Sequence, residues 1–489
     1  MDFKYIVVED WPFLSWLASC PISGSTINIY HGKNVETHEG WFCEAIWDGP
    51  FKAGDFSGTD IVFGSGGHIR DNKSIFVSSA TTLDRLQYMV GPDNVYVSNS
   101  LICLLAATKG TIDPEYQQYF EDFGTIIHGI NRYKRTLATS AGIVNLVYYN
   151  NISWDGNTIT ETPKPQFTRD FATFKKYRDF LKSKLRDISN NISDKLRKHP
   201  YTMLGTSSTG YDSPTVAALA REFGLGEVIS FDTAKNGECD SGKEIADILG
   251  LECHVINRNA WQSGKLPEVL FVAADAKGED VFFKGAERYL SGRVLLTGFH
   301  ADEMWSDRPI ALTDNIVRFD QSGMSLMEYR LWAGFIHFPP ASMGIRQIRD
   351  VYTISHSMEM KPWNVRGSYN RPICRRIVEE CNVPRDSFGR KKKASSVLFF
   401  KKTCFLSEES LNDYKNWLQQ HPCPRSLIKS IRNLSFAFYY AMLRVLSSIF
   451  CWCPAFSKKL VDRADREILF KRVFPWTMER AIEHYAMNR

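Results

Sequence analysis

The stretch YTMLGTSSTGYDSP, from Tyr201 to Pro214, decides the fold of this chain. Residues 201–205 form a short apolar run typical of a buried strand, and a loop of serine, threonine and glycine follows. Pro214 suits the first turn of a helix, and apolar residues then recur at helical spacing as far as Gly224, which suits the helix end. The stretch therefore predicts a strand, a loop and a helix.

The chain after this stretch repeats the same alternation. Residues 242–249 are predicted as a helix closed by Gly250, and further helical stretches run to Leu290. Strands that alternate with helices at this spacing require right-handed crossovers and a parallel sheet. Ligands of such sheets bind at the carboxyl ends of the strands, so the segments after Gly205, Phe231 and Thr297 are the candidates for chemistry. The further predicted strands are 227–231, 253–256 and 293–297.

The N-terminal part, from about residue 27 to residue 146, consists of short β-rich runs separated by Asp-Gly, His-Gly and Gly-Gly turns. This pattern predicts an antiparallel or α+β domain. Residues 150–167 are polar and rich in threonine and proline, which predicts a linker, and a charged amphipathic helix is expected over 170–198. The predicted strands are 26–30, 60–63, 74–78, 95–98 and 143–149.

The chain past about Lys402 has a helical, amphipathic pattern to its end. Residues 434–456 are strongly apolar, but Arg432, Arg444 and Pro454 flank or interrupt them, whereas a membrane span needs about twenty apolar residues without a central charge. We therefore expect a core helix and no transmembrane segment, with a membrane-surface or partner-docking helix as the alternative. The predicted domains are 1–165, 166–400 and 401–489.

The composition is that of a globular chain too long for a single core: 489 residues, 44% hydrophobic and 24% charged. Lys plus Arg outnumber Asp plus Glu by 60 to 55, and a net charge of +5 gives no global field for nucleic-acid binding. Eleven cysteines, an odd number without a C-x-x-C pair, argue against a disulfide framework or a structural zinc site. The first residues do not begin a secretory signal, so the cytoplasm is the expected location.

The strongest chemical signal is the loop 207–213, SSTGYDS, between the predicted strand and helix. Backbone N–H groups of such a loop point at an anion, the helix dipole adds positive charge, and serine hydroxyls add donors. Asp212 at the loop exit is placed to hold a magnesium ion that bridges phosphates. The absence of a Gly-Lys-Ser/Thr ending and of G-x-G-x-x-G excludes a Walker A loop and a dinucleotide site. A plain Ser/Thr turn that caps the helix is the alternative.

A second signal follows the predicted strand 293–297. The run Thr297-Gly-Phe-His-Ala-Asp-Glu303 leaves a parallel strand and therefore lies at the same edge of the sheet as the loop. Asp302 is predicted to share the metal ion with Asp212, while triphosphate oxygens and water complete the octahedron. The alternative is that Asp302 and Glu303 only cap a helix that begins at Met304.

The two motifs together resemble those of the asparagine synthetase family of ATP pyrophosphatases, the PP-loop or adenine nucleotide α-hydrolase-like group. The family loop Ser-Gly-Gly-x-Asp-Ser stands here as Ser208-Thr-Gly-Tyr-Asp-Ser213, and Gly-Asp-Gly-Ala-Asp-Glu stands as Gly298-Phe-His-Ala-Asp-Glu303. Thr209 replaces a loop glycine, and Phe299 and His300 replace Asp and Gly. The likeness covers about residues 167–393, and between the motifs it includes Ser230-Phe231, Asp240-Ser-Gly, Ile245-Ala246 and Leu249-Gly250.

This resemblance implies adenylation, in which a substrate oxygen attacks the α-phosphorus of ATP, pyrophosphate stays in the loop with Mg²⁺, and a nucleophile then displaces AMP. Such a reaction needs positioning and positive charge at the α-phosphate. The late lysine of the family, in an Arg-x-Lys context, matches Arg390 and Lys392, so Lys392 is the first catalytic candidate and Lys391 the reserve. A solvated basic patch or an RNA-contacting tail is the alternative for 390–393. The residues expected to bind ATP are Leu204, Ser207, Ser208, Gly210, Tyr211, Asp212, Ser213, Phe231, Thr297 and Gly298.

The N-terminal domain resembles, more weakly, the glutaminase-like Ntn sandwich of the same family, over 77–100 and in Gly64-Ser-Gly-Gly-His68. A working glutaminase of this kind needs cysteine directly after the initiator methionine, and Asp2 stands there. The resemblance therefore implies a domain without glutaminase activity, as in the β-lactam synthetase branch. Cys20, Cys43 and Cys103 are predicted to pack in the interior.

Several further residues rank lower. Glu328 and Arg330, like Glu359 and Lys361, are predicted to form surface ion pairs, with a substrate carboxylate or ammonium as the alternative partner. The run 371–376, RPICRR, is predicted to be a solvated helix face, with an anion site as the alternative. His300 is placed for acid/base work, with a structural histidine as the alternative. The lower-ranked site candidates are His300, Glu303, Asp240 and Glu328.

We therefore expect an α/β fold with an Ntn-like antiparallel sandwich, a parallel-sheet PP-loop nucleotide-binding domain and a helical C-terminal extension. The expected activity is ATP- and Mg²⁺-dependent adenylation of a carboxylate or amide oxygen on a small molecule or peptide, followed by amide bond formation without a glutaminase. One rival transfers sulfur to the activated carbonyl, with Cys239 or Cys253 as the thiol to test. Another is a non-catalytic protein with a decayed nucleotide site. No nucleic-acid partner is expected, and a homodimer is left open.

Overall fold

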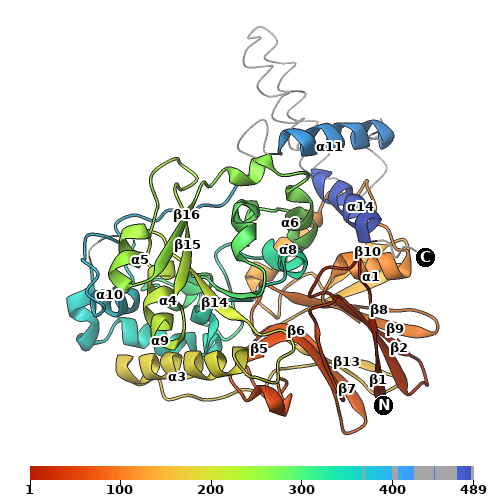
Figure 1. Cartoon of the computed structure of the whole chain (residues 1–489), viewed down its shortest axis with the longest axis horizontal. Coiled ribbons are helices and arrows are strands. Elements are labelled where there is room, and N and C mark those ends of the chain that lie inside the picture. Colours follow the sequence, from red (N-terminus) through yellow and green to blue (C-terminus); the bar gives the residue numbers. More distant parts are fainter. Residues whose placement is uncertain (366, 368, 399–405, 423–444, 446–470, 486–489) are drawn as a thin grey trace.

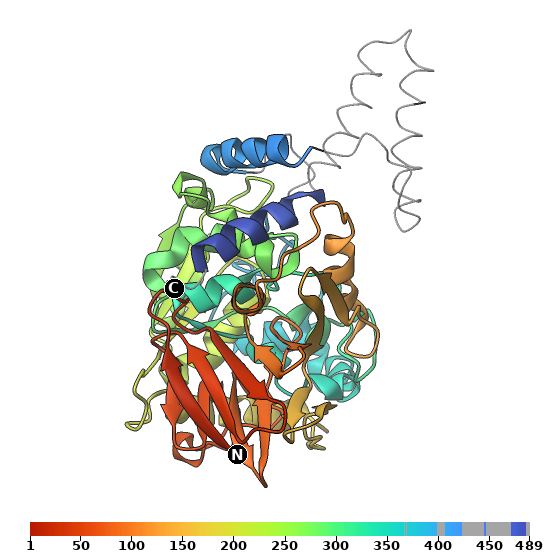
Figure 2. The ribbon, with the colours of Figure 1, turned by 90° about the vertical axis from the view of Figure 1, so that its right-hand side faces the viewer.

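The N-terminal half contains two sheets that are almost entirely antiparallel (Figures 1 and 2). The computed structural model describes residues 1–365, 367, 369–398, 406–422, 445 and 471–485. The seven-stranded sheet has the order β1-β3-β2-β9-β8-β11-β10, with β1 parallel to β3, and the six-stranded sheet has the order β13-β12-β7-β6-β5-β4. The strands of the first are β1 (Asp2–Val7), β2 (Trp16–Pro21), β3 (Thr26–His31), β8 (Arg85–Val90), β9 (Asn94–Ser98), β10 (Thr136–Thr139) and β11 (Gly142–Tyr148). Those of the second are β4 (Glu36–His38), β5 (Trp41–Trp47), β6 (Val62–Arg70), β7 (Lys73–Val77), β12 (Asn151–Trp154) and β13 (Ile159–Thr162).

The two sheets enclose an apolar core made by alternate residues of their strands. Trp16 from β2 stacks on Phe76 from β7, with ring centroids 5.9 Å apart, and Phe42 and Trp154 from the six-stranded sheet join the same cluster. Period-two alternation sends these side chains inward and the polar ones outward. Cys20, Cys43 and Cys103 are buried, which confirms their predicted packing role.

The predicted linker over 150–167 is wrong for most of its length. Residues 151–154 and 159–162 form β12 and β13, and β12 is antiparallel to β7. Ile152 and Trp154 alternate into the sandwich core, and Gly156 turns the chain at φ +101°. The Thr- and Asn-rich composition hid this alternation, because the hairpin is at the edge of the sheet and one face of it meets solvent.

The middle of the chain forms a five-stranded, all-parallel sheet with the order β16-β15-β14-β17-β18. The strand–helix alternation predicted for 201–297 is confirmed. The order reverses between β14 and β17, and in open α/β sheets such a reversal leaves a crevice at the carboxyl ends of the strands. The strands are β14 (Thr202–Thr206), β15 (Glu227–Phe231), β16 (Glu252–Ile256), β17 (Arg293–Leu296) and β18 (Ile336–Phe338), and the first crossover helices are α4 (Asp212–Ala220) and α5 (Lys243–Leu249).

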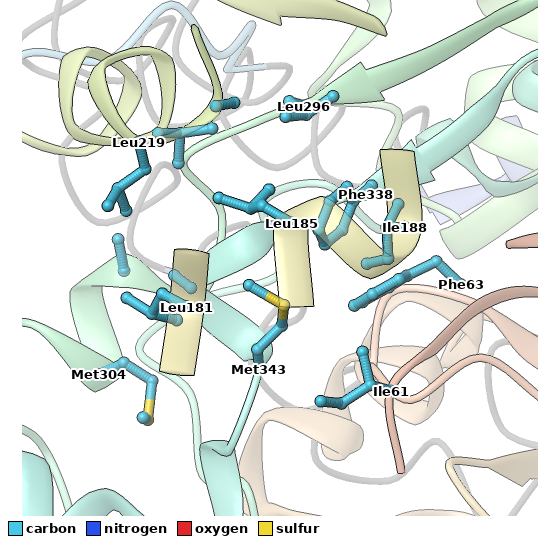
Figure 3. Packing of buried hydrophobic residues seen from close by; sticks show 14 of the residues in the cluster. Ile61, Phe63, Leu181, Leu185, Ile188, Leu219, Leu296, Met304, Phe338 and Met343 are labelled. Atoms are coloured by element: carbon cyan, nitrogen blue, oxygen red, sulfur yellow. The ribbon is translucent and has the colours of Figure 1, made fainter. Parts of the chain in front are cut away.

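Helix α3 (Phe174–Ile192) joins the N-terminal sheets to the parallel sheet (Figure 3). Thr173 caps it by accepting a hydrogen bond from the N–H of Lys176. Leu181, Leu185 and Ile188 project from its apolar side into a single cluster that contains residues of β6, β17 and β18. Phe63 on β6 and Phe338 on β18 also meet directly, at 4.4 Å between ring centroids. The parallel sheet is therefore held against the sandwich by a continuous core.

The other elements of regular secondary structure in the described chain are helices. C-terminal α14 packs on α1 and α6, and α11 lies at the opposite end of the molecule from the N-terminal strands (Figures 1 and 2). Across the ranges that the structure describes, no helix is both long and apolar enough to cross a bilayer. The apolar run 434–456 lies outside the described residues except for Val445. The helices are α1 (Leu101–Thr108), α2 (Tyr119–Gly124), α6 (Glu268–Asp275), α7 (Ala301–Met304), α8 (Leu326–Ala333), α9 (Ile348–Ser355), α10 (Pro372–Glu379), α11 (Glu408–Gln420) and α14 (Val473–Tyr485).

Candidate functional site

A cavity opens at the carboxyl ends of β14, β15 and β17, where the order of the parallel strands reverses. The loops after these strands form one side of it, and the segment 392–396 crosses it from a distant part of the chain. The sequence motifs after β14 and β17 therefore face one space. The predicted site residues that line it are Ser207, Ser208, Gly210, Asp212, Ser213, Phe231, Asp240, Thr297, Gly298, His300, Asp302, Glu303 and Lys392.

Two glycines let the loops approach this closely. A Cβ on Gly298 would lie 2.6 Å from the Cβ of Asp212 and 2.9 Å from the backbone N of Ser213. A Cβ on Gly242 would lie 2.5 Å from the backbone N of Ser208. We call residues 207–213 the serine loop. Any side chain at Gly298 would push the loop after β17 away from the serine loop, and any side chain at Gly242 would push the start of α5 away from it.

The serine loop is held by protein acceptors. Thr209 donates from its N–H and its hydroxyl to Asp240, at 3.2 and 2.6 Å, and the N–H of Gly210 donates to Ser208 Oγ at 3.2 Å. The N–H of Tyr211 donates to the hydroxyl of Tyr369 at 3.4 Å. The last two bonds are long and therefore weak, so an anion could replace these acceptors at small cost.

Asp212 and Asp302 converge on one cation, the guanidinium of Arg371. Arg371 Nη1 donates to Asp212 Oδ1, and Nη2 donates to Asp302 Oδ1. Lys392 Nζ also contacts Asp302 Oδ1, at 2.7 Å. Arg371 is 3% exposed, whereas the carboxylate side chains are 23% and 31% exposed and line the cavity. The two aspartates are therefore placed together, with a positive charge already between them.

The same surroundings shift the pKa values of the two aspartates in opposite directions. Burial raises the pKa of Asp212 above its ordinary value, and Arg371 only partly opposes it. For Asp302, burial also acts to raise the pKa, but Arg371 and then Lys392 outweigh it, so its pKa lies below the ordinary value. Asp302 therefore keeps its negative charge more firmly than Asp212 does.

The donor set fits a magnesium ion that arrives with phosphates. Within the described ranges, no group of three or more His, Cys, Asp or Glu residues is arranged to hold a metal ion by itself. Mg²⁺ commonly uses one or two carboxylates together with substrate phosphates and water, and two converging aspartates supply that number. Binding would require the metal and Arg371 to exchange as partners of Asp212 and Asp302.

The segment 391–396 is fixed over the cavity by both backbone and side-chain contacts. Arg258 donates from Nε to the carbonyl of Ser395 at 2.7 Å and from Nη2 to the carbonyl of Ser396 at 2.8 Å. Lys393 Nζ donates to the carbonyl of Cys239 at 2.6 Å and to Thr209 Oγ1 at 3.2 Å. Lys392 and Lys393 thus bring two cations to the rim of the serine loop.

Some predicted residues lie outside the cavity lining. Leu204 lies on β14, and its side chain is buried in the core. The ring of Tyr211 is also buried, and its hydroxyl accepts a hydrogen bond from Arg375 Nη2 at 2.5 Å. The reserve lysine, Lys391, is exposed and pairs with Glu238 at 2.5 Å. Of the two lysine candidates, only Lys392 contacts a site carboxylate among the described contacts.

The predicted solvated face over 371–376 is wrong for two of its arginines. Arg371 and Arg375 are each 3% exposed, and Arg371 occupies the site. Pro372 starts α10, and this helix packs on α4, so the face that carries Arg375 points inward. Arg376 is partly exposed and pairs with Glu359, with 3.0 Å between Nη1 and Oε2.

The predicted surface ion pairing of Glu328 and Arg330 is also wrong. Helix α8 buries both side chains, each 1% exposed. Glu328 accepts from Ser100 Oγ and from the N–H of Leu101, both at 2.7 Å, and so completes the N-terminal cap of α1. Arg330 pairs with Glu44 at 2.7 Å and with Asp84 at 2.8 Å. Glu328 therefore belongs to the junction with the N-terminal sheets, not to the cavity.

No protein-family model and no curated protein matches this chain. The site is therefore characterised by its geometry and by the sheet that carries it. This five-stranded, all-parallel sheet is consistent with a Rossmann-like, nucleotide-binding domain.

Several groups that line the cavity are not among the residues predicted from the sequence: Asp280, Phe282, Arg318, Asp320 and Tyr369. None of them follows directly after a strand of the parallel sheet, so the strand-end rule gives no signal for them. Arg318 and Asp280 come from irregular segments that tertiary packing brings to the cavity.

Proposed function

We propose that this protein is an ATP- and Mg²⁺-dependent synthetase that adenylates a carboxylate of a small molecule or peptide and then forms an amide bond. The observation that carries the proposal is the convergence of Asp212 and Asp302 on one buried cation beside a serine-rich loop, at the reversal point of a parallel sheet. A triphosphate with a divalent ion is the ligand class that needs both an anion cradle and paired carboxylates.

The phosphates would lie against the loop after β14. Ser207, Ser208 and Ser213 line the cavity next to the N-terminus of α4, where the helix dipole favours negative charge. Lys392 and Lys393 add positive charge at the rim. Asp212 and Asp302 would hold Mg²⁺, which neutralises phosphate charge when it is bound.

In the first step, a carboxylate oxygen of the acceptor forms a bond to the α-phosphorus while the bond from that phosphorus to the bridging oxygen breaks, and pyrophosphate leaves. In the second step, an amine nitrogen attacks the acyl carbon, the bond to AMP breaks, and the amine proton passes to solvent. Lys392, which contacts Asp302, would stabilise negative charge that develops on the α-phosphate. The remaining contribution is positioning.

The nitrogen donor would be an amine from solution or on the substrate. Asp2 begins edge strand β1 and accepts a hydrogen bond from the hydroxyl of Thr26 at 3.0 Å. Its carboxylate cannot serve as the nucleophile of a glutaminase. We therefore propose that the N-terminal sheets act as a scaffold for the synthetase site.

Sulfur transfer is the second candidate, because Cys239 is exposed and its carbonyl accepts the Lys393 hydrogen bond at the rim. Burial raises the pKa of Cys253, which disfavours a thiolate at that position. A Cys239→Ser variant that keeps full turnover would support amide formation, whereas complete loss of turnover would favour sulfur transfer.

A pyrophosphate-release screen tests the proposal, with candidate carboxylates offered in the presence and absence of amine and sulfur donors. We expect release that depends on ATP, Mg²⁺ and one carboxylate class, and amide product only with an amine. Absence of ATP binding in calorimetry would instead identify a non-catalytic protein.

A further inference from the structure

Thr209, in the middle of the serine loop, bonds to two other segments of the chain. Its N–H and its hydroxyl both donate to Asp240 Oδ1, at 3.2 and 2.6 Å, and its hydroxyl oxygen accepts from Lys393 Nζ at 3.2 Å. Its carbonyl accepts from the N–H of Gly389 at 2.9 Å. Thr209 therefore uses each of its polar groups to hold other parts of the protein.

Thr209 stands where the loop of the asparagine synthetase family has glycine, and these contacts show what the side chain adds. A glycine could keep the backbone bonds to Asp240 and Gly389 but could make neither hydroxyl bond. Its neighbours Ser208 and Gly210 line the cavity, whereas Thr209 does not. Asp240 is 5% exposed and takes both donors of Thr209, so neither donor is left for a phosphate.

The basic segment, residues 389–396, crosses the cavity between two anchors. At one anchor, Arg258 donates to the carbonyls of Ser395 and Ser396. At the other anchor, the segment is held by its two bonds to Thr209, one from a backbone N–H and one from a lysine ammonium. The second anchor therefore fixes the part of the segment that lies nearest the serine loop.

The hydroxyl of Thr209 links a carboxylate to an ammonium. It donates its proton to Asp240 and accepts from Lys393, so each bond polarises the other. Lys393 also donates to the carbonyl of Cys239 at 2.6 Å, the residue before Asp240. The basic segment is thus fastened at one point to both the serine loop and the loop that carries Asp240.

We infer that Thr209 is a positioning residue, whose hydroxyl holds the basic segment over the serine loop so that Lys392 is beside Asp302 before a nucleotide binds. The role of Lys392 in this inference rests on the proposed function, in which that lysine acts on the α-phosphate. Lys392 directly precedes Lys393, and its Nζ lies 2.7 Å from Asp302 Oδ1. Loss of the Thr209 hydroxyl should therefore loosen Lys392 while every residue that lines the cavity stays in the chain.

Hydrogen exchange of the full chain without nucleotide, measured by mass spectrometry on peptides that cover 389–396, tests the positioning. Thr209→Val keeps the shape of the side chain without its hydroxyl, and we expect exchange in these peptides to become about tenfold faster. Thr209→Ser keeps the hydroxyl and should exchange like the parent. Thr353→Val is the matched control, because the Thr353 hydroxyl donates to the carbonyl of Arg349 within α9. Unchanged exchange in Thr209→Val overturns the inference.

Lys393→Met removes the same bond from its other end, so the test does not depend on the folding of one variant. It should also speed exchange in the basic segment. In the double variant, the combined effect should be smaller than the product of the two single effects, because the two changes share one bond. Effects that multiply fully would mean that Thr209 and Lys393 act separately, which overturns the inference.

Single-turnover kinetics separates this inference from the proposed function. If the parent releases pyrophosphate, Thr209→Val should slow the chemical step severalfold, leave ATP affinity nearly unchanged, and cause no further loss in a chain that carries Lys392→Ala. A further loss in that chain would mean that Thr209 does not act through Lys392, and it overturns the inference alone. If the parent releases no pyrophosphate, the proposed function is overturned, and the exchange results decide whether Thr209 holds the basic segment.

Discussion

Two arginines in this molecule each lie between two carboxylates, and they do so in different surroundings. Arg330 joins Glu44 and Asp84 at the junction between the N-terminal sheets and α8, where the arginine is 1% exposed and Glu44 is fully buried. Arg371 joins Asp212 and Asp302, whose carboxylates line a cavity. The Arg330 cluster is therefore sealed from solvent, whereas the Arg371 cluster is open to the cavity.

The difference indicates what each cluster can do. Around Arg330, Ser65 donates to Glu44 at 2.5 Å and Asn99 donates to it at 3.2 Å, so the carboxylate is saturated by the protein. Around Arg371, the carboxylates keep oxygen atoms open to the cavity, where a metal ion and phosphates can compete with the guanidinium. We therefore expect the first cluster to be structural, and we propose that the second, the exchangeable cluster, can exchange its arginine for a metal ion.

The largest expected effect comes from breaking the sealed cluster. Arg330→Ala leaves Glu44 and Asp84 buried without their cation and should lower the free energy of unfolding by about 3–5 kcal/mol. Arg371→Ala should cost only about 1–2 kcal/mol, since its carboxylates are partly exposed and Lys392 remains on Asp302. Urea unfolding of both variants measures this, and equal losses would contradict the distinction between the clusters.

The exchangeable cluster should instead control activity. Asp212→Asn and Asp302→Asn should each reduce pyrophosphate release by about a hundredfold or more, because each removes a ligand charge for Mg²⁺. Asp247→Asn is the matched control, as Asp247 pairs with Lys243 on the surface of α5. A normal rate in either test variant removes that aspartate from the site.

A third buried cation, Lys164, extends the comparison, because both of its described hydrogen-bond acceptors are neutral. Lys164 is 2% exposed and donates to the carbonyl of Ser78 at 2.7 Å and to Asn151 Oδ1 at 2.8 Å. Burial lowers its pKa from 10.5 to about 7. Between these pH values the unfolded chain binds more protons than the folded one, so the contribution of Lys164 to stability rises with pH, by at most about 1.4 kcal/mol per unit.

Unfolding of the parent chain and of Lys164→Met at pH 7.5, 8.5 and 9.5 tests this dependence. The parent should gain stability relative to the variant at each step, whereas a constant difference would mean that Lys164 stays protonated in the folded state. Arg330, which has two carboxylate partners, should show no such rise over this range.

The smallest effect is expected for Lys392, at the rim of the cavity. Lys392→Ala should slow the chemical step by about tenfold and leave ATP affinity nearly unchanged, because the lysine acts on developing charge. Lys391→Ala, next to it but paired with Glu238, serves as the control. Single-turnover kinetics separates the two steps, and a larger loss in Lys391→Ala would move the catalytic role to that residue.

The parallel sheet followed from the sequence because each strand and helix has its own local signal. Helix α5 ends at Gly250, which adopts the left-handed conformation that a helix stop favours, and β15 covers the predicted residues 227–231. The meeting of Asp212 and Asp302 followed from the strand-end rule alone. Both predictions needed only short-range pattern and sheet topology.

The remaining features depended on tertiary packing. Arg371 begins an arginine-rich run and Arg330 stands two residues after Glu328, and both patterns suggest solvent-exposed charges. Their burial results from α10 packing on α4 and from α8 packing near the N-terminal sheets. The hairpin of β12 and β13 was hidden because edge strands tolerate polar residues. Arg318 had no signal at all, since it reaches the cavity from an irregular loop.

The central claim is that Asp212 and Asp302 exchange Arg371 for a divalent ion that arrives with a nucleoside triphosphate. Calorimetric titration of ATP into the full chain, with Mg²⁺ and then with EDTA, tests it most directly. The account predicts one binding site that requires Mg²⁺ and is lost in Asp302→Asn but kept in Asp247→Asn. ATP binding of equal strength in EDTA, or in Asp302→Asn, would contradict it.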